Sequence, residues 1–195
     1  NDNTAVGYEA LKLNAGGSRN SAVGRNTLEA NTSGGDNTAM GTNALLLNTT
    51  GCKNTAFGAD SLDSNTTGAE NVAVGQLALQ ANTTGDENTA VGRNSLGANT
   101  TGEKNTALGH STVENNTTGD FNVGIGYGAL QANTTADNNT AVGYQSLDAN
   151  TEGHSNTAVG KGSLGANTTA DENTAVGFNA LTTNTTGSSN TAFGT

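Results

Sequence analysis

Hydrophobic residues recur along the chain at a fixed interval of 17 residues, always within the same short polar context. The pentapeptide Asn-[Thr/Ser/Val]-[Ala/Gly]-hydrophobic-Gly begins at Asn3 and at every seventeenth residue after it, up to Asn190, without insertion or deletion. A strict period of this length is typical of a solenoid, in which each repeat packs against its neighbours. We number the repeat from this asparagine, so that Asn3 occupies position 1 and Arg19 occupies position 17.

The residues within one repeat predict short strands joined by turns. Position 1 is always Asn, position 5 always Gly and position 12 always Asn; position 9 is Leu except at Val113. A helix is disfavoured, because Asn, Thr and Gly recur too often and no apolar stripe of helical period exists. We expect two short strands per coil, at positions 2–5 and 7–11, with Gly at position 5 and Gly or Ala at position 15 in the turns. The predicted fold is all-β: a parallel β-solenoid (β-roll) with one 17-residue coil per repeat and coils about 4.8 Å apart.

Strand alternation divides the apolar residues between two faces. Positions 3 and 4 point in opposite directions, and so do positions 8 and 9. We expect the large residues at positions 4 and 9, such as Val6 and Leu11, to fill the interior, and the small residues at positions 3 and 8 to line an outer face. The converse assignment would expose Val and Leu. Either arrangement leaves an uncharged stripe along the rod, and the thin core predicts that other copies of the chain cover it.

Two asparagine columns are predicted to stabilise the stack. Identical amide side chains in register bond from one coil to the next. The expected structural ladders include Asn71, Asn88 and Asn105 at position 1, and Asn82, Asn99 and Asn116 at position 12.

Charge restricts the partners of this chain. The formal net charge is −10, which gives nucleic-acid binding no electrostatic basis. Every charged residue lies at position 6, 7, 10, 16 or 17, apart from Glu152 at position 14, so these positions are expected to face water. The polar composition alone would favour disorder, but disorder gives no reason for an unbroken period.

The organisation expected is a single repeat domain over residues 1–195. It contains eleven full 17-residue coils from residue 3 and a partial twelfth. No capping repeat is visible and the chain begins without Met, so we expect an excerpt of a longer protein. Cys52 is the only cysteine, which excludes an intrachain disulfide, and no apolar run approaches the length of a membrane span.

No residue pattern indicates catalysis, so we expect the protein not to be an enzyme. His110 and His154 occupy different repeat positions about three coils apart, whereas a catalytic triad needs three side chains that converge on one point. Acidic residues at positions 16 and 17 could in principle hold Ca²⁺, but Lys53 and Lys104 interrupt them, and a solvated edge is the alternative that we favour. No cofactor is therefore expected. The acidic residues concerned are Asp86, Glu87, Glu103, Asp120, Asp137, Asp171 and Glu172.

Aromatic residues gather at position 6, in Tyr8, Tyr127, Tyr144 and Phe178. Tyr127 and Tyr144 occupy adjacent coils and are the candidate surface contacts. They could form a platform for a sugar ring of a host, matrix or glycan ligand. The alternative, which we favour, is packing of one ring on the next.

The element N-T-A-V-G-x-x-A-L resembles the head repeats of trimeric autotransporter adhesins, most closely at residues 3–11, 139–147 and 173–181. It is also similar to repeats of phage-type tail fibres and tail-fibre-like bacterial surface proteins. The resemblance implies a left-handed β-roll, assembly into a homotrimer and an extracellular place on a cell or virion surface. The implied function is a non-enzymatic structural fibre or adhesin segment. The repeat is longer than those of the adhesins because of its extra N-T-T-G turn.

Two other functions fit the same periodicity. An ice-binding solenoid would use the Thr columns at positions 2, 13 and 14. The position 2 column is broken by Ser21, Val72 and Val123, and the position 14 column by Gly16, Ser33 and Glu152. A phage tail-fibre shaft would share the physics of an adhesin segment and differ in origin.

Overall fold

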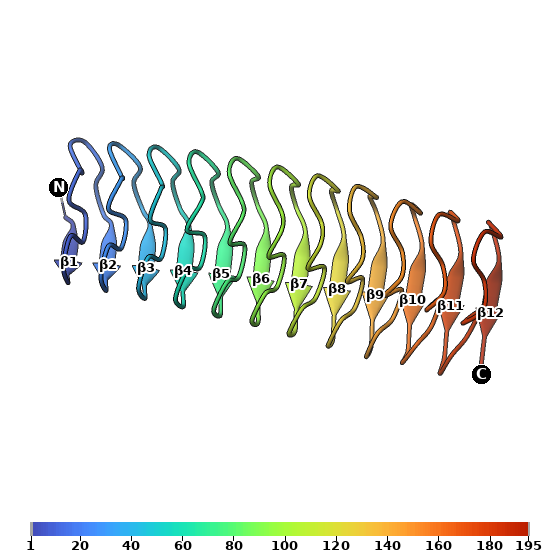
Figure 1. The fold of residues 1–195 in the computed structure, drawn as a ribbon. Coiled ribbons are helices and arrows are strands. Elements are labelled where there is room, and N and C mark those ends of the chain that lie inside the picture. Colours follow the sequence, from blue (N-terminus) through green and yellow to red (C-terminus); the bar gives the residue numbers. More distant parts are fainter. Residues whose placement is uncertain (1, 195) are drawn as a thin grey trace.

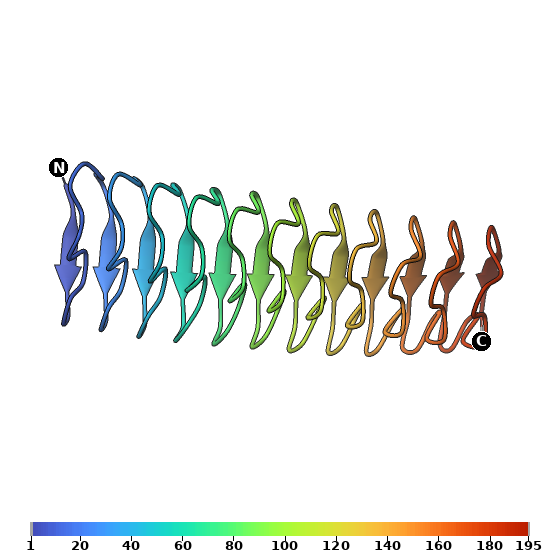
Figure 2. The same cartoon turned by 45° about the horizontal axis from the view of Figure 1, so that its top comes forward.

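Twelve three-residue strands are the regular elements of the computed structural model, which describes residues 2–194. They lie side by side in chain order as one parallel sheet that runs along a row of similar coils (Figure 1; Figure 2). No helix occurs in the described part of the chain. The predicted parallel β-solenoid with one 17-residue coil per repeat is confirmed. The strands are β1 (Thr4–Val6), β2 (Ser21–Val23), β3 (Thr38–Met40), β4 (Thr55–Phe57), β5 (Val72–Val74), β6 (Thr89–Val91), β7 (Thr106–Leu108), β8 (Val123–Ile125), β9 (Thr140–Val142), β10 (Thr157–Val159), β11 (Thr174–Val176) and β12 (Thr191–Phe193).

The register of the sheet follows the repeat. Ala73 of β5 pairs with Ala90 of β6, and Val74 pairs with Val91, so each residue faces its equivalent one repeat later. Columns of equivalent residues therefore run along the rod, and each repeat position defines one column.

The interior is lined by alanine and leucine, and the valines lie outside. Ala73 at position 3 and Leu79 at position 9 are fully buried, whereas Val74 at position 4 is 37% exposed. The expectation that position 4 fills the interior and that position 3 lines an outer face was therefore wrong. In a three-residue strand the middle side chain points to one face and the outer two point to the other. Alanine occupies the inner position because the leucine of the opposite wall already fills the narrow interior.

A second strand per coil is absent from the described residues, which corrects that part of the prediction. Positions 7–11 form a turn in which Leu77 and Leu79 have φ angles of 61° and 50°. These left-handed residues bring positions 8 and 9 to the same side, so Ala78 and Leu79 are both buried. Each left-handed residue costs roughly 1–2 kcal/mol, and burial of a leucine contributes about 1.5–3 kcal/mol. The turn needs no strand to satisfy its backbone, since the Leu79 amide donates to the Ser95 carbonyl of the next coil at 3.0 Å.

Both predicted asparagine ladders are present, and they meet at one carbonyl in each coil. The Asn88 amide donates to the Gly102 carbonyl oxygen at 2.8 Å, and its Oδ1 accepts the backbone N–H of Asn105 at 2.9 Å. Asn99 donates to the same Gly102 oxygen at 2.9 Å and to Asn82 Oδ1 at 2.9 Å. Buried amides are tolerated in an interior when they are paired in this way.

The remaining ladder residues behave alike. Asn71 accepts the Asn88 backbone N–H at 2.9 Å, and Asn116 donates to Asn99 Oδ1 at 2.8 Å. Within residues 2–194, only Asn26 Oδ1 and Asn173 Nδ2 are buried side-chain atoms without a partner. The polar half of the interior is thus nearly saturated with hydrogen bonds that join successive coils.

Candidate interaction surfaces

The broadest candidate surface is the outer face of the sheet, which we call the sheet face. It consists of the side chains at positions 2 and 4 of β1–β12. None of these residues is charged: position 2 carries Thr, Ser or Val, and position 4 carries Val, Met, Phe, Leu or Ile. Several of the position 4 side chains are well exposed, among them Met40 at 46% and Leu108 at 47%. The uncharged stripe expected from the sequence is therefore this face.

Charged residues at position 17 border the sheet face and pair along the rod. Arg19 contacts Asp36 at 2.5 Å, and Lys53 contacts Glu70 at 2.8 Å, in each case between neighbouring coils. Exposed ion pairs of this kind add little stability. They do neutralise neighbouring charges beside the sheet face.

The aspartates at position 16 hold the backbone of the preceding coil. Asp120 Oδ1 accepts the Glu103 N–H at 2.7 Å, and Asp137 Oδ1 accepts the Asp120 N–H at 2.7 Å. His154 has the same role, because its Nδ1 accepts the Asp137 N–H at 2.9 Å. Within residues 2–194 no group of three or more His, Cys, Asp or Glu side chains is arranged to hold a metal ion. The geometry indicates a hydrogen-bonded acidic edge.

The acidic candidates occupy two repeat positions, 16 and 17, and the side chains at these positions make different contacts. Asp86 and Asp171 belong to the position 16 column and accept the backbone N–H groups of Ala69 and His154 at 2.7 Å. Glu87 and Glu172 lie at position 17 and are exposed. The seven acidic candidates therefore form two adjacent columns with different contacts.

The aromatic candidates form part of a longer row at position 6, which we call the aromatic ridge: Arg93, His110, Tyr127, Tyr144, Lys161 and Phe178. The rings of Tyr127 and Tyr144 stack with centroids 5.4 Å apart and planes 12° apart. His110 meets Tyr127 edge-on at 5.4 Å, and Lys161 Nζ lies 5.6 Å from the centre of the Tyr144 ring. The ring faces are thus occupied by neighbours within the row, which supports the packing interpretation over a platform for one sugar ring.

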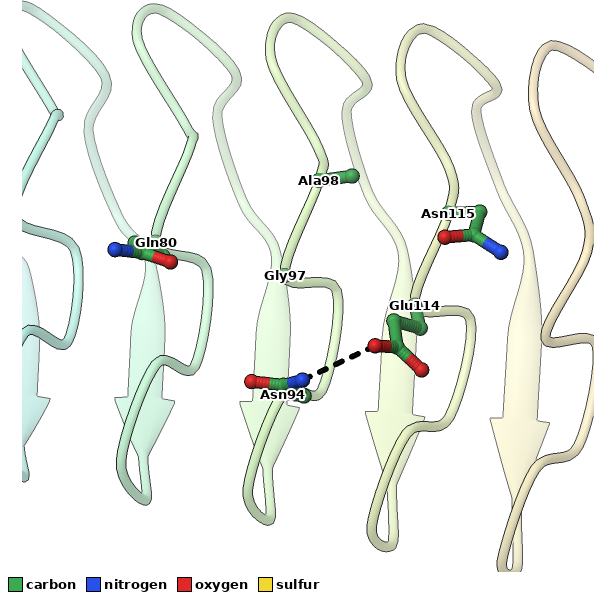
Figure 3. Close-up of a pocket in the computed structure, with 6 residues that line it drawn as sticks. All are labelled: Gln80, Asn94, Gly97, Ala98, Glu114 and Asn115. Atoms are coloured by element: carbon green, nitrogen blue, oxygen red, sulfur yellow. Dashed lines mark hydrogen bonds between the residues drawn. The ribbon is translucent and has the colours of Figure 1, made fainter.

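A shallow notch of about 200 Å³ lies at Gly97, beside the side chains of Asn94 and Glu114 (Figure 3). Position 10 carries a side chain in most coils but none at Gly97, so Gln80 and Glu114 flank a gap in their column. Asn94 donates to Glu114 Oε1 at 3.0 Å and Gln131 donates to Oε2 at 2.8 Å. Burial acts to raise the pKa of Glu114, but hydrogen bonds outweigh it, so the carboxyl pKa lies below its ordinary value.

Sequence reasoning missed this notch, although its signal was present. A glycine at a position otherwise filled by a side chain leaves a gap in a regular stack. The sequence pattern also suggested Tyr127 and Tyr144 as an isolated pair, whereas the structure shows Arg93, His110 and Lys161 in the same row. The cations share repeat position 6 with the tyrosines, so the period alone could have shown this.

The two histidines are not brought together. His110 lies in the aromatic ridge, with Nε2 3.3 Å from Arg93 Nη1, and His154 lies in the position 16 column. Among residues 2–194 no helix is long and apolar enough to cross a membrane. Comparison of the chain with protein-family models, with curated proteins and with solved structures found no match to any of them.

Proposed function

We propose that this chain is a non-enzymatic rod segment of an extracellular fibre or adhesin on a cell or virion surface, assembled from identical chains as a trimer. The observation that carries the proposal is the sheet face. It is uncharged along all twelve strands and exposes apolar side chains from one end of the rod to the other. The resemblance of the repeat to adhesin heads and tail fibres supports the extracellular setting.

The exposed apolar surface favours a protein partner. Eleven steps of about 4.8 Å give the sheet face a length on the order of 50 Å. Contiguous apolar surface of such extent is uncommon on soluble monomers and usually marks an interface. None of the described coils fully buries more than one large apolar side chain, so a partner that covers the sheet face would bury apolar surface that the interior does not provide.

A second copy of the chain is the partner that fits the face best. The face repeats every coil, and an identical chain repeats with the same step, so two rods can match along their whole length. Charged columns at positions 6 and 17 flank the face and stay at the rim, where they keep water contact. Threonines at position 2 provide hydroxyl groups that pair across an interface.

The rod shape supports a structural role over a catalytic one. Similar coils present similar shallow surfaces, whereas small-molecule sites are concave and use convergent polar groups that are not repeated. The notch at Gly97 is open and is lined by residues of three neighbouring coils. Binding by this segment would then be distributed along columns.

The test is the oligomeric state of a variant with Val91→Lys and Val142→Lys, which places two charges on the sheet face. Burying unpaired ammonium groups in an apolar interface is strongly unfavourable, so we expect light scattering to report a monomer with an unchanged circular dichroism spectrum. The matched control carries Thr84→Lys and Thr135→Lys, at exposed position 14, and should assemble as the wild type does. A wild-type chain that is monomeric and folded at micromolar concentration would overturn the proposal.

Ice binding remains a second candidate because of one observation. The position 2 threonines form a column on the regular sheet face, and Glu152, the charge that argued against an ice plane, lies at position 14, outside that face. Against it, position 4 carries side chains as different as Val91 and Phe57, which makes the face uneven. Thermal hysteresis of the wild-type chain would support this candidate, and its absence would remove it.

A further inference from the structure

Position 6 is the only charged column of the rod with cations and no carboxylates. It carries Arg25, Arg93 and Lys161, together with His110, while the 17 acidic side chains all lie in other columns. The column is therefore positively charged, whereas the chain as a whole has a net charge of −10. An exposed surface whose charge opposes that of the whole molecule indicates an anionic partner, because the rest of the rod would repel one.

The aromatic ridge joins Arg93, His110 and Lys161 into one continuous feature across six coils. Arg93 contacts His110, His110 contacts Tyr127, and Tyr127 stacks on Tyr144. Lys161 then lies between two rings, 5.6 Å from the centre of Tyr144 and 5.7 Å from that of Phe178. The ridge is therefore a supported row of side chains.

The orientation of the rings decides what the ridge offers to a ligand. Neighbours cover the faces of Tyr127 and Tyr144, yet the two residues are 49% and 48% exposed, so they present ring edges and phenol groups outward. The edge of an aromatic ring is the positive part of its quadrupole, and the phenol O–H is a donor. Ring edges, hydroxyls and cations all favour anionic or electron-rich oxygen atoms.

The columns at positions 4 and 7 carry no charge in the coils of the ridge. In the same coils, position 4 is uncharged and position 7 carries Asn94, Ser111, Gly128, Gln145, Gly162 and Asn179. The acidic residues of these coils occupy positions 10, 14, 16 and 17. One carboxylate lies close to these columns: Glu114 at position 10 is near His110, and Asn94 and Gln131 donate hydrogen bonds to its two oxygens. An anion that follows position 6 therefore meets no carboxylate at positions 4 and 7, and Glu114 lies beside its path at one coil.

We propose that the aromatic ridge binds a linear, sparsely charged acidic polysaccharide that lies along the rod. Arg93 and Lys161 are four coils apart, or about 19 Å at about 4.8 Å per coil, with uncharged tyrosines between them. This pattern matches a polymer whose carboxylates are separated by neutral sugar rings, and one coil is close to the length of one sugar residue. Nucleic acid carries far denser charge, with one phosphate per ~1.7 Å of duplex, and the acidic rod would repel it.

A ligand of this class would give the proposed adhesin its binding partner. The proposal rests on the proposed function in one respect: the ridge must stay exposed in the assembled rod. The probe is a hyaluronan decasaccharide, which carries one carboxylate per two sugars, titrated against the wild-type assembly at low salt. We expect measurable binding that weakens as salt is raised, because exposed charges are screened. A neutral maltodextrin of the same length should bind at least several-fold more weakly.

A pair of double variants tests the location of the site. Arg93→Gln with Lys161→Gln removes the two cations of the ridge and should weaken hyaluronan binding about tenfold, the effect of two exposed charge contacts. Lys53→Gln with Lys104→Gln makes the same change in net charge at position 17 and should alter binding less than twofold.

The possible outcomes separate this inference from the proposed assembly. The inference is wrong if hyaluronan and maltodextrin bind equally, if both double variants lose affinity to the same extent, or if single-stranded DNA or polyglutamate binds more tightly than hyaluronan. Light scattering of the same samples reports assembly independently. A monomeric chain that binds hyaluronan through the ridge would support this inference and contradict the trimer.

Discussion

The glycine at position 5 offers a direct test of how the coils stack. Gly75 has a φ angle of 132°, a region that side-chain-bearing residues rarely occupy. A Cβ atom added there would lie 2.6 Å from the Gly92 carbonyl oxygen of the next coil. A normal contact needs about 3.4 Å or more, so the coils would have to separate locally by about 0.8 Å.

The cost of Gly75→Ala follows from this geometry. The hydrogen bonds from Gly92 N–H to Val74 O and from Asn94 N–H to Gln76 O join the Gly75 coil to the next one at 2.7 and 3.1 Å, and a separation of that size would stretch both beyond the normal range. Loss of two such bonds costs about 1–3 kcal/mol, and the backbone strain adds about 1–3 kcal/mol. We expect a loss of about 3 kcal/mol or more in the free energy of unfolding, or a fall of about 6–12 °C in Tm for a chain of this size.

The matched control is Gly97→Ala, the same substitution in a neighbouring coil. Gly97 lies at position 10, its φ angle is not positive, and an added Cβ would come no closer than 3.3 Å to its nearest neighbour, Asn94 O. Most other coils carry a side chain there, and removal of a flexible glycine stabilises by about 0.4–1 kcal/mol through the unfolded state. Thermal unfolding followed by circular dichroism should leave Tm nearly unchanged or slightly raised. Equal losses in the two variants would refute the stacking argument.

Three further predictions concern the interior and the acidic edge. Leu79→Ala should cost about 2–5 kcal/mol in chemical denaturation, because Leu79 is fully buried, and a loss below 1 kcal/mol would mean that the interior collapses around the gap. Asn88→Leu leaves the Asn105 N–H without its partner and removes one donor to Gly102 O, so a loss of about 2–4 kcal/mol is expected; a neutral result would show that the ladder contributes nothing net. Burial raises the pKa of Asp148 above its ordinary value of 3.8, so the folded state binds more protons than the unfolded state and loses stability as pH rises through that range. Asp148→Asn should therefore raise Tm at pH 7 relative to the wild type and have little effect at pH 3, and a gain of the same size at both pH values would contradict the assignment.

The period alone determined much of this fold. An unbroken spacing of 17 residues places equivalent residues beside each other, so the parallel register, the coil length and both asparagine ladders follow from it. The restriction of charge to a few positions also identified the water-facing columns. For the same reason the adjacency of Tyr127 and Tyr144 was predictable, since residues 17 apart must be neighbours in such a stack.

The candidate surfaces were predictable only in part. Their membership follows from the repeat, but the orientation of the side chains does not. That the rings of Tyr127 and Tyr144 cover each other's faces, and so present edges outward, depends on side-chain packing between coils. The notch at Gly97 likewise exists only because neighbouring coils hold Gln80 and Glu114 in place on either side.

The direction of the side chains and the path of positions 7–11 were decided by tertiary structure. Leucine alone disfavours the left-handed conformation, and no local signal at Leu79 or Leu96 predicts it. The conformation persists because each turn donates hydrogen bonds to the next coil and buries its leucine against the column of position 3 alanines. Those contacts join residues of different coils, so their energy is absent from any single repeat. The sequence could therefore determine which residues stack, whereas only the stacked structure decided which of them point inward.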